Sequence, residues 1–164
     1  MEIDWEKHHR FMPRNSGLCG PTTIWMILNA CEIKKSLLAI TLATWKRWYG
    51  TPSILLTAYL KKYFCLVNYK VGSSISDISR HIKQGHIVII NFQDGEEDEL
   101  EGHYAIVSEY KKGSLTLIDS SNEHPWKWEI STKKLKERWY DDLTEDGKLY
   151  HTGFMIWLDP KSKR

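Results

Sequence analysis

The hydrophobic pattern of this chain changes its period near the middle, and that change limits the folds open to the sequence. Up to about residue 85, apolar residues recur at the spacing of a helix face. From residue 86 onward, β-branched residues run continuously or alternate with polar ones, as they do in strands. The first part predicts helices at residues 20–31, 41–50, 53–64 and 74–85, and a short strand at 65–72.

Turn and cap residues support these bounds. Pro21 occupies a first-turn position, Ser53 can cap the third helix, and Gly50 and Gly85 are placed to end the second and fourth. The second part predicts strands at 86–92, 103–110, 114–121, 126–131 and 150–158, with a helix at 132–143. Helices followed by an antiparallel sheet predict an α+β fold of two packed layers.

Size and composition narrow the organisation of the chain and its partners. With 164 residues, 41% of them hydrophobic, the sequence is expected to form a single domain over residues 1–164. The 23 basic and 21 acidic residues leave a formal charge of +2, which does not favour nucleic acid or an anionic membrane as partner. No stretch has the character of a secretory signal or a membrane span. We therefore expect a cytoplasmic protein.

The three cysteines form no even-numbered disulfide framework, so we expect free thiols in a reducing compartment. Cys31 and Cys65 lie on apolar segments and are expected in the core. Cys19 differs, because it is followed at once by Gly20 and Pro21 and then by a helix. The unpaired N–H groups and the dipole of a helix start favour a thiolate over a thiol. We expect Cys19 to be exposed there as a nucleophile, which also needs a nearby imidazole.

The predicted strands supply an imidazole and a carboxylate. His103 begins one strand, and Asp119 ends the next strand across a hairpin. Residues that begin one antiparallel strand and end its neighbour lie side by side, so Asp119 can accept the second ring N–H of His103 and fix its tautomer. Asn122, farther from the strand end, is the alternative for this role.

An acidic loop precedes His103 directly. The segment DGEEDELEG, residues 94–102, carries six carboxylates. One interpretation is a solvated hairpin loop. The other is an acidic rim that favours basic substrates or raises the pKa of His103 by attraction.

Four motifs carry a resemblance to papain-like cysteine peptidases: LCGPTTIWMIL, IKQGHIVIINF, GHYAIVSEY and LTLIDSS, with the candidate residues in the order Cys, His, Asp. The sequence most resembles the bacteriocin-processing peptidases, which cut leader peptides after a double glycine, and their stand-alone relatives. The resemblance covers about residues 12–158.

This resemblance implies a papain-like fold, in which an N-terminal helical lobe carries the nucleophile and packs on an antiparallel sheet. It implies hydrolysis of a peptide or isopeptide bond, with a peptide or protein as the substrate and no cofactor. On the matching positions, it implies Cys19 as nucleophile, His103 as general base and acid, and Asp119 as the residue that orients His103.

One position departs from the family pattern. The family has a glutamine six residues before the nucleophile, whose amide helps the cysteine N–H to stabilise the oxyanion, and this chain has Pro13 there. Asn15, four residues before Cys19, could deliver an amide instead. Loss of one such donor typically slows catalysis about 100-fold or more.

Three other functions stay open on the same residues. An acyltransferase would pass the acyl group to an amine, and a catalytically weak peptide-binding module would fit the missing glutamine. A metal site built from Cys19, His103 and Asp119 is disfavoured, because structural zinc prefers four protein ligands in local pairs. The sequence leaves the oligomeric state open.

Overall fold

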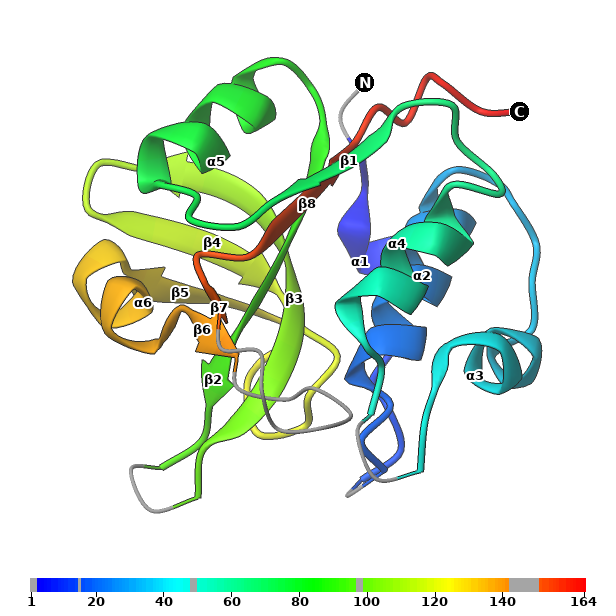
Figure 1. Cartoon of the computed structure of the whole chain (residues 1–164), viewed down its shortest axis with the longest axis horizontal. Helices are drawn as coiled ribbons and strands as arrows, with labels where there is room; N and C mark the ends of the chain where they lie inside the picture. Colours follow the sequence, from blue (N-terminus) through cyan, green and yellow to red (C-terminus); the bar gives the residue numbers. More distant parts are fainter. Residues whose placement is uncertain (1–2, 15, 48–49, 97–98, 142–150) are drawn as a thin grey trace.

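The computed structural model describes residues 3–14, 16–47, 50–96, 99–141 and 151–164. Four helices, α1 to α4, gather on one side of the molecule, and the strands lie on the other side with α5 and α6 (Figure 1). The helices are α1 (Trp5–His8), α2 (Cys19–Ala30), α3 (Leu37–Thr44), α4 (Ser53–Leu60), α5 (Ile75–Lys83) and α6 (Thr132–Arg138). In the described ranges, no helix has both the length and the hydrophobicity of a membrane-spanning segment.

The described strands form a six-stranded antiparallel sheet in the order β1-β8-β2-β3-β4-β5, and a small second sheet of β6 and β7. Helices that precede and cover an antiparallel sheet confirm the predicted α+β class. The strands are β1 (Val67–Lys70), β2 (Ile87–Asp94), β3 (Glu101–Lys111), β4 (Ser114–Ile118), β5 (Lys127–Ser131), β6 (Tyr140–Asp141), β7 (His151–Thr152) and β8 (Met155–Leu158).

Both faces of the sheet are covered by apolar side chains. Ile87 and Ile89 of β2 join the core between the sheet and α2, whereas Val88 and Ile90 join the core beneath α5 and α6. A strand buried on both faces reads as a continuous apolar run, which explains the pattern of residues 86–92. The central strands are therefore held firmly on both sides.

Strand pairing brings the ends of three strands together at one end of the sheet. In the β2–β3 hairpin, Phe92 pairs with His103 and Asp94 with Glu101, and in the next hairpin Ile106 pairs with Ile118. The end of β2, the start of β3 and the end of β4 therefore meet, as the sequence predicted for the last two.

Several predicted bounds are confirmed. The helix expected at 20–31 is α2, and the helix expected at 74–85 is α5. The side chain of Ser74 caps α5 in a capping box with Asp77, and Gly85 follows the helix with a positive φ of 78°.

Other predicted bounds were wrong for identifiable reasons. The helix expected at 41–50 is α3, which begins earlier because the Ser36 hydroxyl accepts the N–H of Ala39. It ends at Thr44, and Lys46 pairs with Gly50 in an antiparallel bridge.

The helices expected at 53–64 and 132–143 and the strand expected at 150–158 also differ from the prediction. The N-cap of α4 is Pro52, and Ser53 is its first residue. The helix expected at 132–143 ends at Arg138 and is followed by β6 as far as the structure describes it. The strand expected at 150–158 is divided into β7 and β8, with Gly153 at a positive φ of 61° between them.

The start of α2 depends on close contact between Gly20 and Thr51. A Cβ at Gly20 would lie 2.6 Å from the Thr51 hydroxyl and closer still to the Thr51 Cβ. Helix propensity alone predicts that Gly20→Ala stabilises the fold by about 1 kcal/mol. The overlap predicts a loss of about 1–3 kcal/mol, and we expect this loss because a Cβ moves only with its backbone.

Urea unfolding of the wild type and Gly20→Ala measures the free energy of unfolding. Thr51→Gly should restore most of the stability in the Gly20→Ala background, with Thr51→Gly alone as the control. A stabilised Gly20→Ala protein would contradict the expectation.

Candidate active site

Cys19 is the first residue of α2, as the sequence predicted for a helix start. Pro21 lies in the first turn, and the first backbone bond of the helix runs from the N–H of Thr22 to the carbonyl of Leu18 at 2.9 Å. The predicted exposure was wrong, because only 8% of Cys19 is exposed. The thiol lies in the contact between the two lobes, where it interacts with His103.

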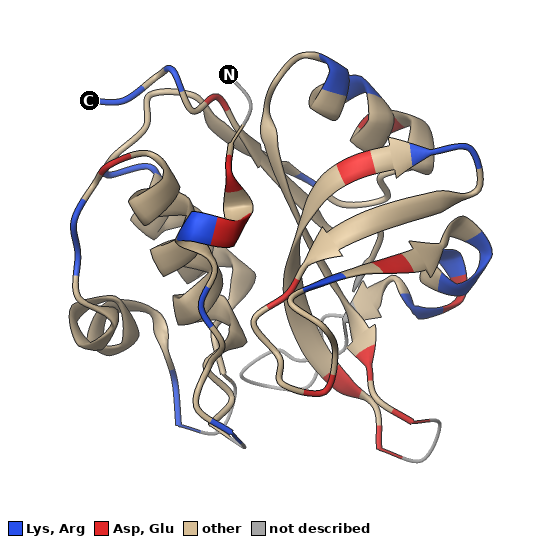
Figure 2. Cartoon of the chain, turned by 180° about the vertical axis from the view of Figure 1, so that it is seen from behind, with Lys and Arg blue, Asp and Glu red and all other residues tan. Residues whose placement is uncertain are grey.

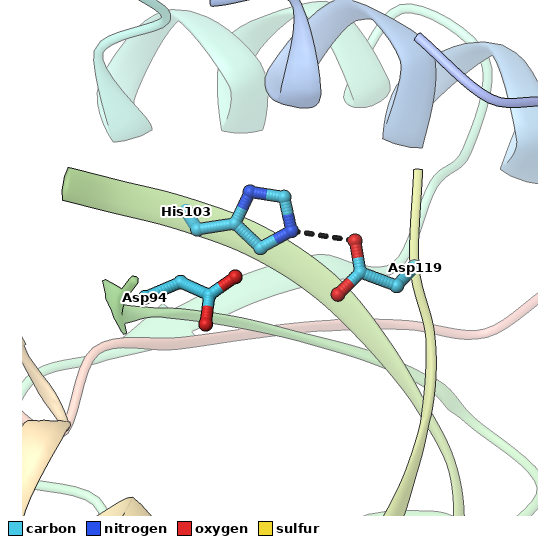
Figure 3. Close-up of side chains that lie close together, drawn as sticks. All are labelled: Asp94, His103 and Asp119. Atoms are coloured by element: carbon cyan, nitrogen blue, oxygen red, sulfur yellow. Dashed lines mark hydrogen bonds and ion pairs between the residues drawn. The ribbon is translucent and has the colours of Figure 1, made fainter. Parts of the chain in front are cut away.

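His103 stands near the start of β3 and is bonded to Asp119 just after β4. Nε2 of His103 donates to Oδ1 of Asp119 at 2.6 Å, because a carboxylate can only accept. Figure 3 shows the other ring nitrogen, Nδ1, on the side of the ring turned toward the helices. The ring of Phe92 packs edge-on against the imidazole with 5.7 Å between the ring centroids. The structure therefore brings Cys19, His103 and Asp119 together.

Asp119 is fully buried, and donors surround its carboxylate. Oδ1 also accepts the backbone N–H of Ser121 at 2.8 Å, and Oδ2 accepts the indole N–H of Trp128 at 2.8 Å. Burial alone would raise the pKa of Asp119, but the charge of His103 and these hydrogen bonds lower it. The backbone is fixed as well, because Nε2 of His9 donates to the Asp119 carbonyl at 2.7 Å. Asp119 is thus an ionised, immobile acceptor.

Opposing effects act on the charge of His103. Burial of the ring favours its neutral form, whereas the charge and hydrogen bond of Asp119 favour the imidazolium, and the Cys19 thiol adds to them. The net effect raises the pKa of His103 well above its usual value of about 6.5. The surroundings of the ring thus favour the imidazolium over the neutral form.

Asp94 is a further carboxylate close to this pair. One of its oxygens, a ring nitrogen of His103 and an oxygen of Asp119 lie within 4.8 Å of one another (Figure 3). Atoms this close could share a metal ion, but His103 and Asp119 already bond each other, so the geometry is that of a hydrogen-bond network. Burial alone would raise the pKa of Asp94. The hydrogen bonds donated by His124 and the charge of His103 act against burial, and the pKa is lowered.

The other described carboxylates of the acidic loop face solvent. Glu96, Glu99 and Glu101 are exposed, whereas Glu97 and Asp98 lie outside the described residues. Figure 2 shows the acidic residues gathered at the end of the β2–β3 hairpin. Among the described carboxylates of the loop, only Asp94 therefore combines partial burial with proximity to His103.

The remaining sequence candidates are placed as follows. Asn15 lies outside the described residues. Asn122 is exposed and its amide donates to the Met12 carbonyl at 3.0 Å, so it does not take the place of Asp119 beside His103. All three cysteines are free thiols. Cys31 is buried, and burial raises its pKa to about 11, whereas Cys65 is exposed and its predicted core position was wrong.

Sequence reasoning missed three residues that hold this site. His124 bonds Asp94, Trp128 bonds Asp119, and the Tyr104 hydroxyl donates to the Thr51 carbonyl at 2.8 Å. Tyr104 thereby ties the strand that carries His103 to the connection leading into α4. The one available signal was the polar tip of an aromatic residue on a buried strand, which needs a partner.

The raised pKa of His103 predicts how stability depends on pH. A histidine whose pKa is higher in the folded state stabilises the fold fully below its unfolded pKa of about 6.5, and this contribution is lost as the pH rises through the folded pKa. We expect the difference in free energy of unfolding between wild type and His103→Gln to be largest near pH 6 and to shrink toward pH 9. Urea unfolding across this range measures it, and a difference that grows with pH would contradict the assignment.

A helix-start cysteine beside a histidine–aspartate pair on adjacent strands, in a helical lobe packed on an antiparallel sheet, is the arrangement of the papain-like class. The profile of the Peptidase_C39 like family matches residues 2–144. The chain belongs to this family.

Solved structures agree with the fold. The peptidase domain of Streptococcus ComA, a bifunctional ABC transporter of a quorum-sensing pathway, has a TM-score of 0.66 at 12% identity, over 92% of this chain and 98% of that domain. A C39-like peptidase from Bacillus anthracis has a TM-score of 0.67 at 14% identity, over 96% of both chains. A double glycine motif protease from an AMS/PCAT transporter, solved with its leader peptide, has a TM-score of 0.59 at 10% identity, over 91% and 89%. A search of curated proteins gave no match.

Proposed function

We propose that this protein is a cysteine peptidase that hydrolyses a peptide or isopeptide bond through Cys19, His103 and Asp119. The observation that carries the proposal is the 2.6 Å bond between His103 and Asp119 on a ring that also interacts with the thiol at the start of α2. The family and the papain-like fold support the class. We treat residues 1–164 as one peptidase domain, since the helices and the sheet share a core.

The proposed reaction proceeds through a thioester. The Cys19 thiolate attacks the substrate carbonyl carbon and forms the S–C bond, which moves an electron pair onto the oxygen. As the carbonyl re-forms, the C–N bond breaks and the leaving nitrogen takes a proton from the His103 imidazolium. His103 then removes a proton from water, which attacks the thioester and releases the acid and the Cys19 thiolate.

Asp119 serves this cycle by holding one nitrogen of His103. Since Nε2 is bonded to Asp119, Nδ1 is the nitrogen left to exchange protons with the sulfur, the leaving amine and water. Three donors keep the carboxylate in place, so the ring stays oriented in both protonation states. The backbone N–H of Cys19 is the proposed oxyanion donor, with Asn15 as the proposed second donor.

The proposed substrate is an extended peptide. The leader-peptide complex of the double glycine motif protease makes peptides with a Gly-Gly pair the first substrates to test. Two variants of the proposal remain open, the first on an observation in the sequence and the second on general thioester chemistry. Pro13 at the usual glutamine position favours a weakly catalytic peptide-binding module, and a thioester can equally pass its acyl group to an amine.

One experiment separates these functions. Wild type and Cys19→Ala are incubated with a mixture of Gly-Gly-containing and unrelated peptides, with and without glycinamide, and the products are analysed by mass spectrometry. Cleavage by wild type alone supports the peptidase, and glycinamide adducts in excess of acids support a transferase. Equal peptide binding by both proteins without any product would overturn the proposed hydrolysis and favour the binding module.

A further inference from the structure

A second histidine–carboxylate pair, His124 and Asp94, lies next to the His103–Asp119 pair. Nε2 of His124 lies 2.8 Å from one oxygen of Asp94 and 3.0 Å from the other, so a single N–H is shared between them. Both side chains are shielded, with 26% of the His124 and 13% of the Asp94 side chain exposed. The hydrogen bond that His124 donates to Asp94 and the charge of Asp94 raise the pKa of His124, and burial opposes them. Each member of this pair thus shifts the pKa of the other toward the charged form.

The second pair contacts the first one through Trp128. The ring of His124 is stacked on the Trp128 indole, with 4.0 Å between centroids and 15° between planes. The N–H of the same indole donates to Oδ2 of Asp119. The stacked ring of His124 thus helps to orient the Trp128 indole. The indole N–H in turn helps to orient the Asp119 carboxylate, which bonds His103.

His103 has two carboxylates within reach. Asp119 bonds it, and an oxygen of Asp94 lies within 4.8 Å of the same group of atoms. A carboxylate without a partner at that distance would attract the imidazolium strongly and compete for its proton. Only His124 is bonded to the carboxylate of Asp94 among the side-chain contacts that the structure describes.

We propose that His124 is a positioning residue for His103: it occupies Asp94, so that Asp119 alone orients the imidazole, and it holds the Trp128 indole against Asp119. The proposal rests on the proposed function, in which His103 is the base and acid. In such an enzyme, this arrangement gives the His103 imidazole one carboxylate partner, Asp119, and so defines the tautomer of the neutral ring.

The titration of His103 depends on the charged and titratable groups that face the two histidines. His103 is faced by Cys19 from α2, Asp119 after β4 and Asp94 from β2, and His124 is faced by Asp94, Asp119 and His103. Removing His124 leaves the charge of Asp94 without a partner, which stabilises the imidazolium. Removing the charge of Asp94 has the opposite effect.

The test measures the titration midpoint of His103 by NMR of its ring nuclei in the full chain. Phe at position 124 keeps a flat ring on Trp128, so His124→Phe should raise the midpoint by about one pH unit. Asp94→Asn should lower it, and the double variant should return it close to the wild-type value because it removes both members of one hydrogen-bonded pair.

His86→Phe is the matched control, because His86 also bonds a side chain, His81 at 2.9 Å, but lies at the opposite end of β2. It should leave the midpoint unchanged. A midpoint that does not move in the three variants at positions 94 and 124, or that moves in one direction in all of them, would overturn the proposal even if the melting temperature falls. The titration needs no substrate, so a failure to cleave peptides would count against the peptidase alone.

Discussion

His103→Ala is expected to slow the alkylation of Cys19 by iodoacetamide at pH 6.5 by about 100-fold. An ordinary thiol, with a pKa of about 8.5, is only about 1% ionised at that pH, and the thiolate is the species that reacts. In the wild type, the imidazole of His103 interacts with the Cys19 sulfur, and a cysteine nucleophile needs such a partner to be activated. The variant lacks this partner. Mass spectrometry of time-quenched samples from pH 5 to 9 measures the rate at each cysteine.

The other two cysteines are internal controls for this measurement. Cys31 is buried with its pKa raised to about 11, so it should react slowly in both proteins. Cys65 is exposed and should react at the same rate in both. If Cys19 reacts no faster than Cys65 in the wild type, the resemblance to peptidases is one of fold alone, and the peptide-binding module becomes the better proposal.

Asp119→Ala is expected to lower the free energy of unfolding by about 3–5 kcal/mol near pH 6. The substitution removes a fully buried carboxylate. The ring N–H of His103, the backbone N–H of Ser121 and the indole N–H of Trp128 then lose their acceptor. Removing the hydrogen-bonded opposite partner of a buried charge costs far more than breaking an exposed pair. Urea unfolding of the two proteins measures the loss.

Asp77→Ala provides the matched control for this substitution. The Asp77 side chain is also shielded, at 8% exposure, but its partners Lys70 and Arg80 are about half exposed. We expect a loss of about 1–2 kcal/mol there, mainly from the cap of α5. The double variant of Asp119→Ala with His103→Ala should lose less than the sum of the single losses, and strict additivity would contradict the coupling of the pair.

The parts of the fold that the sequence predicted are those set by side-chain periodicity. The buried run at residues 87–92 and the capped helix ending before Gly85 depend on neighbours in the sequence, so local pattern was enough. The bounds that were wrong depend on single contacts. One hydroxyl, that of Ser36, moves the start of α3, and the turn at Gly153 divides a run that looked continuous.

The site was predicted in part for a similar reason. Strand pairing places His103 beside Asp119, and pairing follows from the hairpin pattern. The position of His124 follows no periodicity, because it lies in the turn before β5 and reaches Asp94 from a distant hairpin. The low exposure of Cys19 could not be predicted either, since it depends on how closely the two lobes pack.

The place of β8 in the sheet links the proposed site to the C-terminal segment of the chain. β8 is the last strand along the chain, yet it lies between β1 and β2 and pairs with both. Contacts between distant parts of a chain form slowly during folding. β2 carries Asp94 and pairs with β3, the strand of His103, so the pairing of β2 is complete only after the C-terminal segment has folded back onto the sheet. We expect the proposed triad to reach its final geometry only in a chain whose last strand is already in place.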